Sequence, residues 1–384
     1  MGSEMCIRDS LDSVQLLLAS CTRALKLDSE VKKGRVDKTA RLQYDWLARQ
    51  TLRWSRPDGT RILSVDEDSP YFDELFKFVL KQTRDQSDTV ALRALRGKRK
   101  GSADDIAWPT EHSEWSELAT MRTTWQPAAA RLAVRFPRNA LSAELAVGKQ
   151  IVLSGNVMPS VRIEGNPLHV ESEWEEVCWE TDDDMDYLEL ECDLSNGWKI
   201  QRQFLLARRD LFAFTADVLF GPTVSSIKYH RRLPLVDGVV LEQPDETTEA
   251  MILGDKQLGT VIPISLPEWQ SAQRESRLRV EPARLEIATR ARSLYAPLFY
   301  DLDPARRRKA LTWRQLTVAE ELQPVSPEVA VAYRVQIGKK QWVIYRSLDK
   351  PGNRTFIGLN LISEFLVARF KSDGEIEPLI DVTG

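Results

Sequence analysis

Histidine and cysteine are scarce in this sequence, and the familiar catalytic motifs are missing. The 384 residues include three histidines and four cysteines, and no two cysteines form a CxxC pair. This scarcity argues against zinc, iron–sulfur and histidine-rich centres, so we expect no metal and no cofactor. The chain also lacks a glycine-rich phosphate loop, a GxSxG elbow and an HExxH pair. The sequence therefore carries no recognised catalytic signature.

Strong net charge and long apolar runs are absent as well. The formal net charge is −4, so no overall positive field attracts nucleic acid, and we expect no nucleic-acid partner. No apolar run approaches the roughly 20 residues of a transmembrane helix. The apolar fraction of 42% is ordinary for a globular protein. We expect a soluble protein without a membrane span; its location and oligomeric state do not follow from the sequence.

The stretch from Trp174 to Leu219 predicts a four-stranded antiparallel meander. Between Leu188 and Leu194, apolar residues alternate with acidic ones, which predicts a strand with one buried and one solvated face. Ser195-Asn196-Gly197 supplies residues suited to a tight hairpin. Many more short apolar segments, separated by Gly, Pro, Asn and Asp, follow up to the C-terminus. This pattern predicts two large packed antiparallel sheets.

The N-terminal part has a different organisation. Residues 1–10 (MGSEMCIRDS) have no periodicity and resemble a non-native leader. Residues 11–100 carry apolar side chains at helical spacing, with an N-cap expected at Ser69-Pro70. Residues 101–128, rich in Trp and Pro, are interpreted as an irregular connector, and residues 129–384 as the β domain. The predicted fold class is mainly β, with a short helical segment before a large antiparallel two-sheet β-sandwich.

One cluster combines side chains suited to acid–base chemistry. Tyr229 and His230 could act as general base and acid, and Arg232 could hold a sugar carboxylate. In a strand, however, Tyr229 and Arg231 face one side, whereas His230 and Arg232 face the other. The alternative interpretation is a cationic outer strand face with an acidic neighbour.

A second basic run follows Asp303-Pro304. Arg306, Arg307 and Arg308, together with Arg231, are candidates for binding an anionic ligand such as an acidic polysaccharide. The alternative is an exposed helical turn between strands.

Acidic and sulfur-containing residues in the meander have competing interpretations. The Asp182–Asp186 run could bind calcium or form a solvated turn. Glu189, Glu191 and Asp193 could supply paired acids for glycoside hydrolysis or line a wet strand face. Cys178 and Cys192 could pair across neighbouring strands, although buried free cysteine is the commoner state.

The order of elements, helices followed by a large antiparallel sandwich, resembles the C-terminal part of the heparinase II/III-like polysaccharide lyases over residues 30–384. In that family an α/α toroid precedes a supersandwich, and the sugar lies between them. The resemblance implies a carbohydrate-associated protein, and in the family Tyr, His and Arg or Asn surround an acidic sugar. Because no motif for those residues aligns with this chain, our main hypothesis is acidic-glycan binding without complete catalytic machinery. The alternatives are a truncated lyase that uses Tyr229 and His230, and a non-enzymatic structural or interaction protein.

Overall fold

The computed structural model describes residues 11, 14–31, 36–64, 72–83, 86–98, 106–270, 275–350 and 352–383. These residues divide between two compact units. Unit 1 holds the chain up to Pro137 and Ser142–Gly155, and unit 2 holds Arg138–Leu141 and Asn156–Gly384. The expected leader 1–10 and the expected N-cap at Ser69-Pro70 lie outside the described residues.

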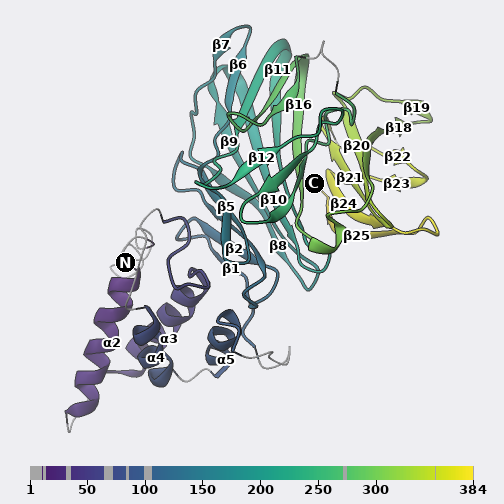
Figure 1. The fold of residues 1–384 in the computed structure, drawn as a ribbon. Helices are drawn as coiled ribbons and strands as arrows, with labels where there is room; N and C mark the ends of the chain where they lie inside the picture. The colour runs from purple at the N-terminus through teal and green to yellow at the C-terminus, as the bar shows by residue number, and fades with distance from the viewer. Residues whose placement is uncertain are drawn as a thin grey trace. The chain divides into compact units, whose positions relative to one another are not determined.

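Unit 1 begins with the helices that the apolar spacing predicts. They are α2 (Val14–Glu30), α3 (Lys38–Arg53), α4 (Phe72–Gln82) and α5 (Gln86–Leu95) (Figure 1). Asp37 caps α3, since its side chain accepts a hydrogen bond from the Ala40 backbone N–H at 2.7 Å. Leu18 of α2 and Val79 of α4 are fully buried in one apolar cluster. Tertiary packing of one helix face therefore stabilises these helices.

A five-stranded sheet completes unit 1, in the order β1-β2-β3-β4-β5. Its strands are β1 (Glu111–Ser113), β2 (Leu118–Arg122), β3 (Ala130–Arg135), β4 (Ser142–Val147) and β5 (Gln150–Asn156). Residues 101–128, expected as an irregular connector, thus contain two strands. Trp125 is buried and donates from Nε1 to the Ala107 carbonyl, whereas Trp115 is 66% exposed. The division between the units also falls near residue 155 rather than at the expected residue 128.

The meander forms the middle of an 11-stranded sheet in unit 2. The main order is β12-β13-β14-β16-β11-β10-β9-β8, with β15 paired to β16, β6 to β11 and β7 to β6. The strands are β6 (Ser160–Ile163), β7 (Asn166–Pro167), β8 (Glu175–Thr181), β9 (Met185–Leu194), β10 (Trp198–Ala207), β11 (Phe212–Arg232), β12 (Val240–Glu242), β13 (Ala250–Leu253), β14 (Gln257–Ile262), β15 (Arg277–Arg279) and β16 (Arg284–Asp301). The turn between β9 and β10 has positive φ at Asn196 (64°) and Gly197 (71°), as its residues predict. The predicted meander is confirmed.

The longest strand of this sheet, β11, joins two segments that the sequence separates. Its register with β16 shifts between Phe220 and Ser225, so the intervening Gly-Pro-Thr-Val segment interrupts the pairing without ending the strand. β11 and β16 therefore extend past the meander, and their far ends pair with β6 and β15. Figure 1 shows β6 and β7 at this end of the two long strands.

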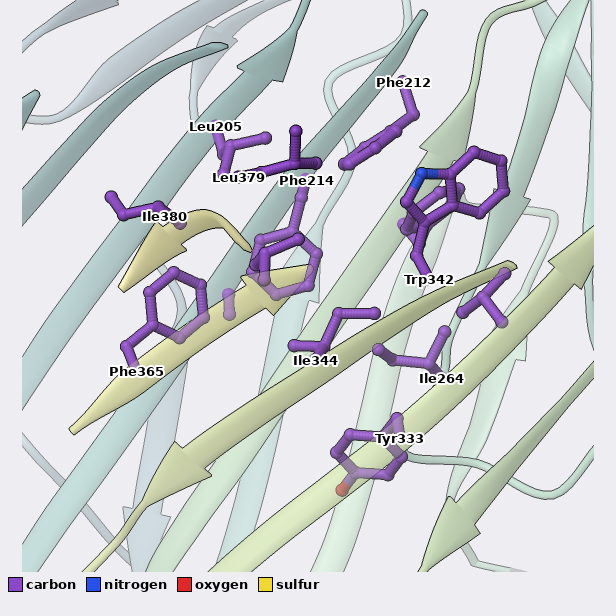
Figure 2. Close-up of a cluster of buried hydrophobic side chains, with 14 of the residues drawn as sticks. Leu205, Phe212, Phe214, Ile264, Tyr333, Trp342, Ile344, Phe365, Leu379 and Ile380 are labelled. Atoms are coloured by element: carbon purple, nitrogen blue, oxygen red, sulfur yellow. The ribbon is translucent and has the colours of Figure 1, made fainter. Parts of the chain in front are cut away.

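A second sheet covers one face of the first. It has the order β17-β20-β21-β24-β25, and a small four-stranded sheet has the order β19-β18-β22-β23. The strands are β17 (Leu311–Leu316), β18 (Ala319–Glu320), β19 (Gln323–Pro324), β20 (Ala330–Ile337), β21 (Lys340–Ser347), β22 (Arg354–Phe356), β23 (Leu359–Leu361), β24 (Phe365–Phe370) and β25 (Ile376–Val382). Figure 2 shows Phe212 and Phe214 of β11 packed among side chains of β21 and β24. The Phe212 ring stacks on Phe299 with 4.5 Å between the ring centroids, and it meets Trp342 edge-on with a centroid distance of 5.4 Å. The predicted two-sheet β-sandwich is confirmed.

Candidate functional site

The predicted catalytic residues lie on the far half of β11, where they alternate between the two faces of the sheet. Tyr229 and Arg231 are buried, whereas His230 and Arg232 are exposed. Tyr229 and His230 therefore point in opposite directions, as the strand pattern predicts. The structure does not bring this acid–base pair together on one surface.

Tyr229 belongs to a buried ionic network inside the sheet. Its hydroxyl donates to Asp217 Oδ2, and the guanidinium of Arg202 binds both oxygens of the same carboxylate. The side chains of Arg202 and Asp217 have no exposed surface. Burial, and then the negative charge of Asp217, raise the pKa of Tyr229 well above its usual value. A neutral, enclosed phenol cannot act as a base on a polysaccharide at the surface, so this geometry assigns Tyr229 a structural role.

The residues of the predicted anion-binding set are also divided. Arg231 is buried and donates to Thr215 Oγ1 at 2.7 Å. Arg306 ends a short 3₁₀ turn, η4 (Pro304–Arg306), where it binds Asp301 and lies 5.0 Å from the Trp342 ring centroid. Arg307 is half-buried and Arg308 is exposed. Arg306 therefore anchors the turn from inside the protein. Of the four arginines predicted to bind an anion, Arg308 is the one that faces solvent.

Glu189 departs from the expected wet strand face. Both faces of β9 are buried from Met185 to Leu190, because the second sheet covers the acidic side. Glu189 pairs with Arg346 at 3.0 Å and accepts a hydrogen bond from the Tyr187 hydroxyl at 2.5 Å. It is a buried structural ion, so the acid-pair interpretation with Glu191 is not supported. The wet-face interpretation holds only toward the end of the strand, where Asp193 is exposed.

The acidic turn and the cysteines of the meander also have structural roles. Asp184 lies 2.9 Å from Arg369, whose hydrogen bond lowers the pKa of this carboxyl. Among the described residues, no group of three His, Cys, Asp or Glu side chains could hold a metal ion. Cys178 and Cys192 are free. Cys178 stands opposite Glu189 in the β8–β9 register, so it lies on the other sheet face from Cys192 and cannot pair with it.

The exposed face at the end of β11 carries a concentration of positive charge. Cross-strand partners share a face of a sheet, so the register places side chains of β6, β16 and β15 beside those of β11. We call the following set the cationic face: Arg162, Lys228, Arg232, Arg277, Arg279, Arg284 and Arg290. Within the part of the chain that the structure describes, two carboxylates form ion pairs with its members, Glu286 and Glu164. Seven cations against two anions leave a local excess of five positive charges on a chain whose net charge is −4.

Glu286 organises one side of the cationic face. It stands opposite His230, and the Nε atoms of Arg277, Arg279 and Arg284 lie 3.0, 2.9 and 2.5 Å from its carboxylate oxygens. Burial acts to raise the pKa of Glu286, but hydrogen bonds from the three arginines outweigh it and lower the pKa to about 2. One carboxylate thus holds three guanidinium groups side by side. The period-two pair Arg277-x-Arg279 is the sequence signal that could have located this cluster.

Two adjoining cavities lie beside the cationic face. One has a volume of about 430 Å³ and includes Trp269, Gln270 and Arg277 in its lining. The other, of about 450 Å³, includes Arg290 and Tyr333. Both have Ser276 in their walls. Arg277 and Arg290 belong to the cationic face, so each cavity opens next to positive charge.

Comparisons with known proteins find similarity in structure alone. No protein-family model matches the sequence, and no curated protein matches it. Heparan sulfate lyase HepC from Pedobacter heparinus superimposes with a TM-score of 0.57 at 14% identity, over 90% of this chain and 58% of that one. A heparinase III structure gives a TM-score of 0.56 at 10% identity, over 88% and 59%. Another heparinase III gives 0.51 at 13% identity, over 81% and 53%.

These matches cover most of this chain but somewhat more than half of each solved structure. The TM-scores of 0.51 to 0.57 establish a shared fold, and at identities of 10 to 14% the likeness extends to the fold alone. The resemblance inferred from the order of helices and strands is thereby confirmed, and the chain has the fold of a large part of heparinase III and heparan sulfate lyase HepC.

Proposed function

We propose that this protein binds an acidic glycan through the cationic face. The observation that carries the proposal is the local excess of five positive charges on four neighbouring strands. Guanidinium groups bind carboxylates and sulfates with two parallel hydrogen bonds, and a row of them suits a polymer with repeated negative charge. The heparan sulfate lyase fold supports a carbohydrate ligand by analogy.

A flat strand surface suits an extended polymer better than a small anion. Residues two apart on one strand are separated by roughly 6–7 Å, and neighbouring strands by about 4.8 Å. Lys228 and Arg232, four residues apart on β11, are thus separated by about 13 Å. Arg162 on β6 stands one strand spacing from Lys228, and Arg284 on β16 stands one strand spacing from Arg232. Such a grid can contact several charges of one chain at once, which gives affinity without a deep pocket.

The lyase hypothesis based on Tyr229 and His230 has less support. Tyr229 is enclosed beside Asp217, and His230 lies on the other face of the sheet. A polysaccharide that reaches His230 cannot reach the Tyr229 hydroxyl. We therefore favour binding without catalysis by this pair, and a search for ultraviolet-absorbing unsaturated products from uronate polymers tests the alternative.

The experiment is a thermal-unfolding and titration series with heparin, polygalacturonate and a neutral glucan, at low and high salt. A ligand that binds only the folded state raises the unfolding midpoint. We expect a salt-sensitive rise with an acidic polymer and none with the glucan. The double variant Lys228→Glu, Arg232→Glu should weaken binding by roughly tenfold or more, since it reverses two exposed charges.

The matched control is Lys339→Glu, Lys340→Glu, which changes the net charge equally at an exposed hairpin outside the cationic face. Equal losses in both double variants would show that binding follows overall charge and would contradict the proposal. No response to any acidic polymer would favour a structural or interaction protein.

A further inference from the structure

Trp269 is an exposed tryptophan held on a rigid segment beside the cationic face. Its side chain is 60% exposed. Leaving so large an apolar side chain in water forgoes on the order of 2–3 kcal/mol of burial free energy. Exposed tryptophans of this kind are enriched where a ligand or partner docks.

Hydrogen bonds fix the segment on both sides of this indole. Thr248 donates from Oγ1 to the Pro267 carbonyl at 2.7 Å, and its N–H donates to the Glu268 carbonyl at 2.9 Å. Gln270 donates from Nε2 to the Thr247 carbonyl at 2.6 Å. The backbone that carries Trp269 is thus preorganised, so a ligand that stacks on the indole does not have to order it first.

The cavity next to Trp269 combines an aromatic wall with a few polar groups. Its volume of about 430 Å³ lies within the range of about 300–1,000 Å³ that is typical of ligand pockets. Gln243, Asp245, Gln270 and Arg277 also line it. The amides and the carboxylate can bind sugar hydroxyls, and the guanidinium can bind an acidic substituent. An apolar ring face with hydroxyls at its rim, as in a pyranose, matches this set.

Arg277 connects the cavity to the cationic face. Its Nε lies 3.0 Å from Glu286, and half of its side chain remains exposed. Asp245 repels negative charge, so the acidic group of a bound residue should lie on the Arg277 side. The second cavity shares Ser276 in its wall, so it adjoins this one and offers room for a neighbouring residue of the polymer.

We propose that this cavity is a glycan subsite in which one pyranose ring of the acidic polymer stacks on Trp269 while Arg277 binds its acidic substituent. The inference rests on the proposed function and adds a position at which ring shape, rather than charge alone, is recognised. A stacked ring contributes apolar contact that salt does not screen. The cationic face then supplies the salt-dependent part of the affinity, and Trp269 supplies a salt-independent part.

Titration calorimetry with size-fractionated heparin oligosaccharides, at several salt concentrations, tests this division. Trp269→Ala should weaken binding by roughly tenfold and leave the salt dependence unchanged, because it removes no charge. Trp269→Phe should recover most of the loss, since it keeps an aromatic face. Trp115→Ala, which removes another exposed tryptophan, in unit 1, should bind like the wild type.

The outcomes separate this inference from the proposed function. Wild-type affinity in Trp269→Ala, together with a loss in Lys228→Glu, Arg232→Glu, would overturn the subsite and leave the cationic face in place. Equal losses in Trp269→Ala and Trp115→Ala would also overturn it. Failure of the wild type to bind any acidic polymer would refute both.

Discussion

Replacing Tyr229 by phenylalanine separates a structural role from a catalytic one. The change keeps the buried ring and removes the hydroxyl that donates to Asp217. A hydrogen bond to a charged acceptor contributes about 1.5–3 kcal/mol, and the carboxylate would keep its ion pair with Arg202. For a unit of this size, 1 kcal/mol corresponds to roughly 2–4 °C in Tm, so we expect the midpoint to fall by roughly 3–12 °C.

The assay is thermal and urea unfolding followed by circular dichroism, combined with heparin titration of the folded variant. Tyr333→Phe is the matched control, because burial is the cause that raises the pKa of that hydroxyl and no carboxylate partner is found for it among the described residues. It should cost less than about 1 kcal/mol. Glycan affinity should be unchanged in Tyr229→Phe. A Tyr229→Phe protein with wild-type stability and lost glycan response would refute the structural assignment.

Three further results are expected. Glu286 has a folded pKa of about 2, below its ordinary value of 4.5, so its contribution to the free energy of unfolding is complete above pH 4.5 and is lost as the pH falls toward 2. A Glu286→Gln variant should lose roughly 1–3 kcal/mol of this stability in urea titrations, a figure discounted for the partly exposed arginine partners. An unchanged dependence of stability on pH would contradict the described cluster. Trp342→Ala should reduce the free energy of unfolding by about 3–5 kcal/mol because the indole is fully buried, whereas Trp115→Ala should change it by less than about 0.5 kcal/mol. Equal losses of stability in the two variants would argue against the described core. Burial raises the pKa of Cys178 to about 11 and that of Cys192 to about 12. Both thiols should therefore react slowly with a disulfide reagent at pH 8 in the native protein, and rapidly after denaturation without reductant. A Cys178–Cys192 disulfide that persists after denaturation would contradict the register of β8 and β9.

The sequence was informative wherever a local pattern decides the structure. Alternation between Leu188 and Leu194 locates β9, and the Asn196-Gly197 turn locates its hairpin partner, because strand faces and turn conformations depend on neighbouring residues. The alternation of side chains between the two faces of a strand also placed Tyr229 and His230 of β11 on opposite faces. Helical spacing located α2 to α5 for the same reason.

Residues whose surroundings come from distant parts of the chain were harder to interpret. Glu189 has the spacing of a solvated residue, yet it is buried because Arg346, far along the chain, pairs with it from the second sheet. Arg306 belongs to a run that suggests a basic patch, but Asp301 and the Trp342 ring hold it inside. Local pattern cannot reveal which side of a strand a second sheet will cover.

Sequence reasoning suggested a cationic outer face on β11 with an acidic neighbour, but it could not show which other strands contribute to it. Its members come from four strands, β6, β11, β15 and β16, and only the register brings Arg162, Lys228 and Arg284 side by side. The basic run of β11 gave part of the signal, since His230 and Arg232 were correctly placed on one face. Arg277-x-Arg279 gives a local period-two signal, but Trp269 lies in a segment without a recognisable motif, so the cavity that the two residues line required the structure.

The most direct test of acidic-glycan binding is calorimetric titration of the full chain with heparin at low and high salt, beside the Lys228→Glu, Arg232→Glu variant and its Lys339→Glu, Lys340→Glu control. The proposed function predicts salt-sensitive binding in the wild type and the control, and a loss of roughly tenfold or more in the β11 variant. Binding that is absent in the wild type, or equal in all three proteins, would contradict it.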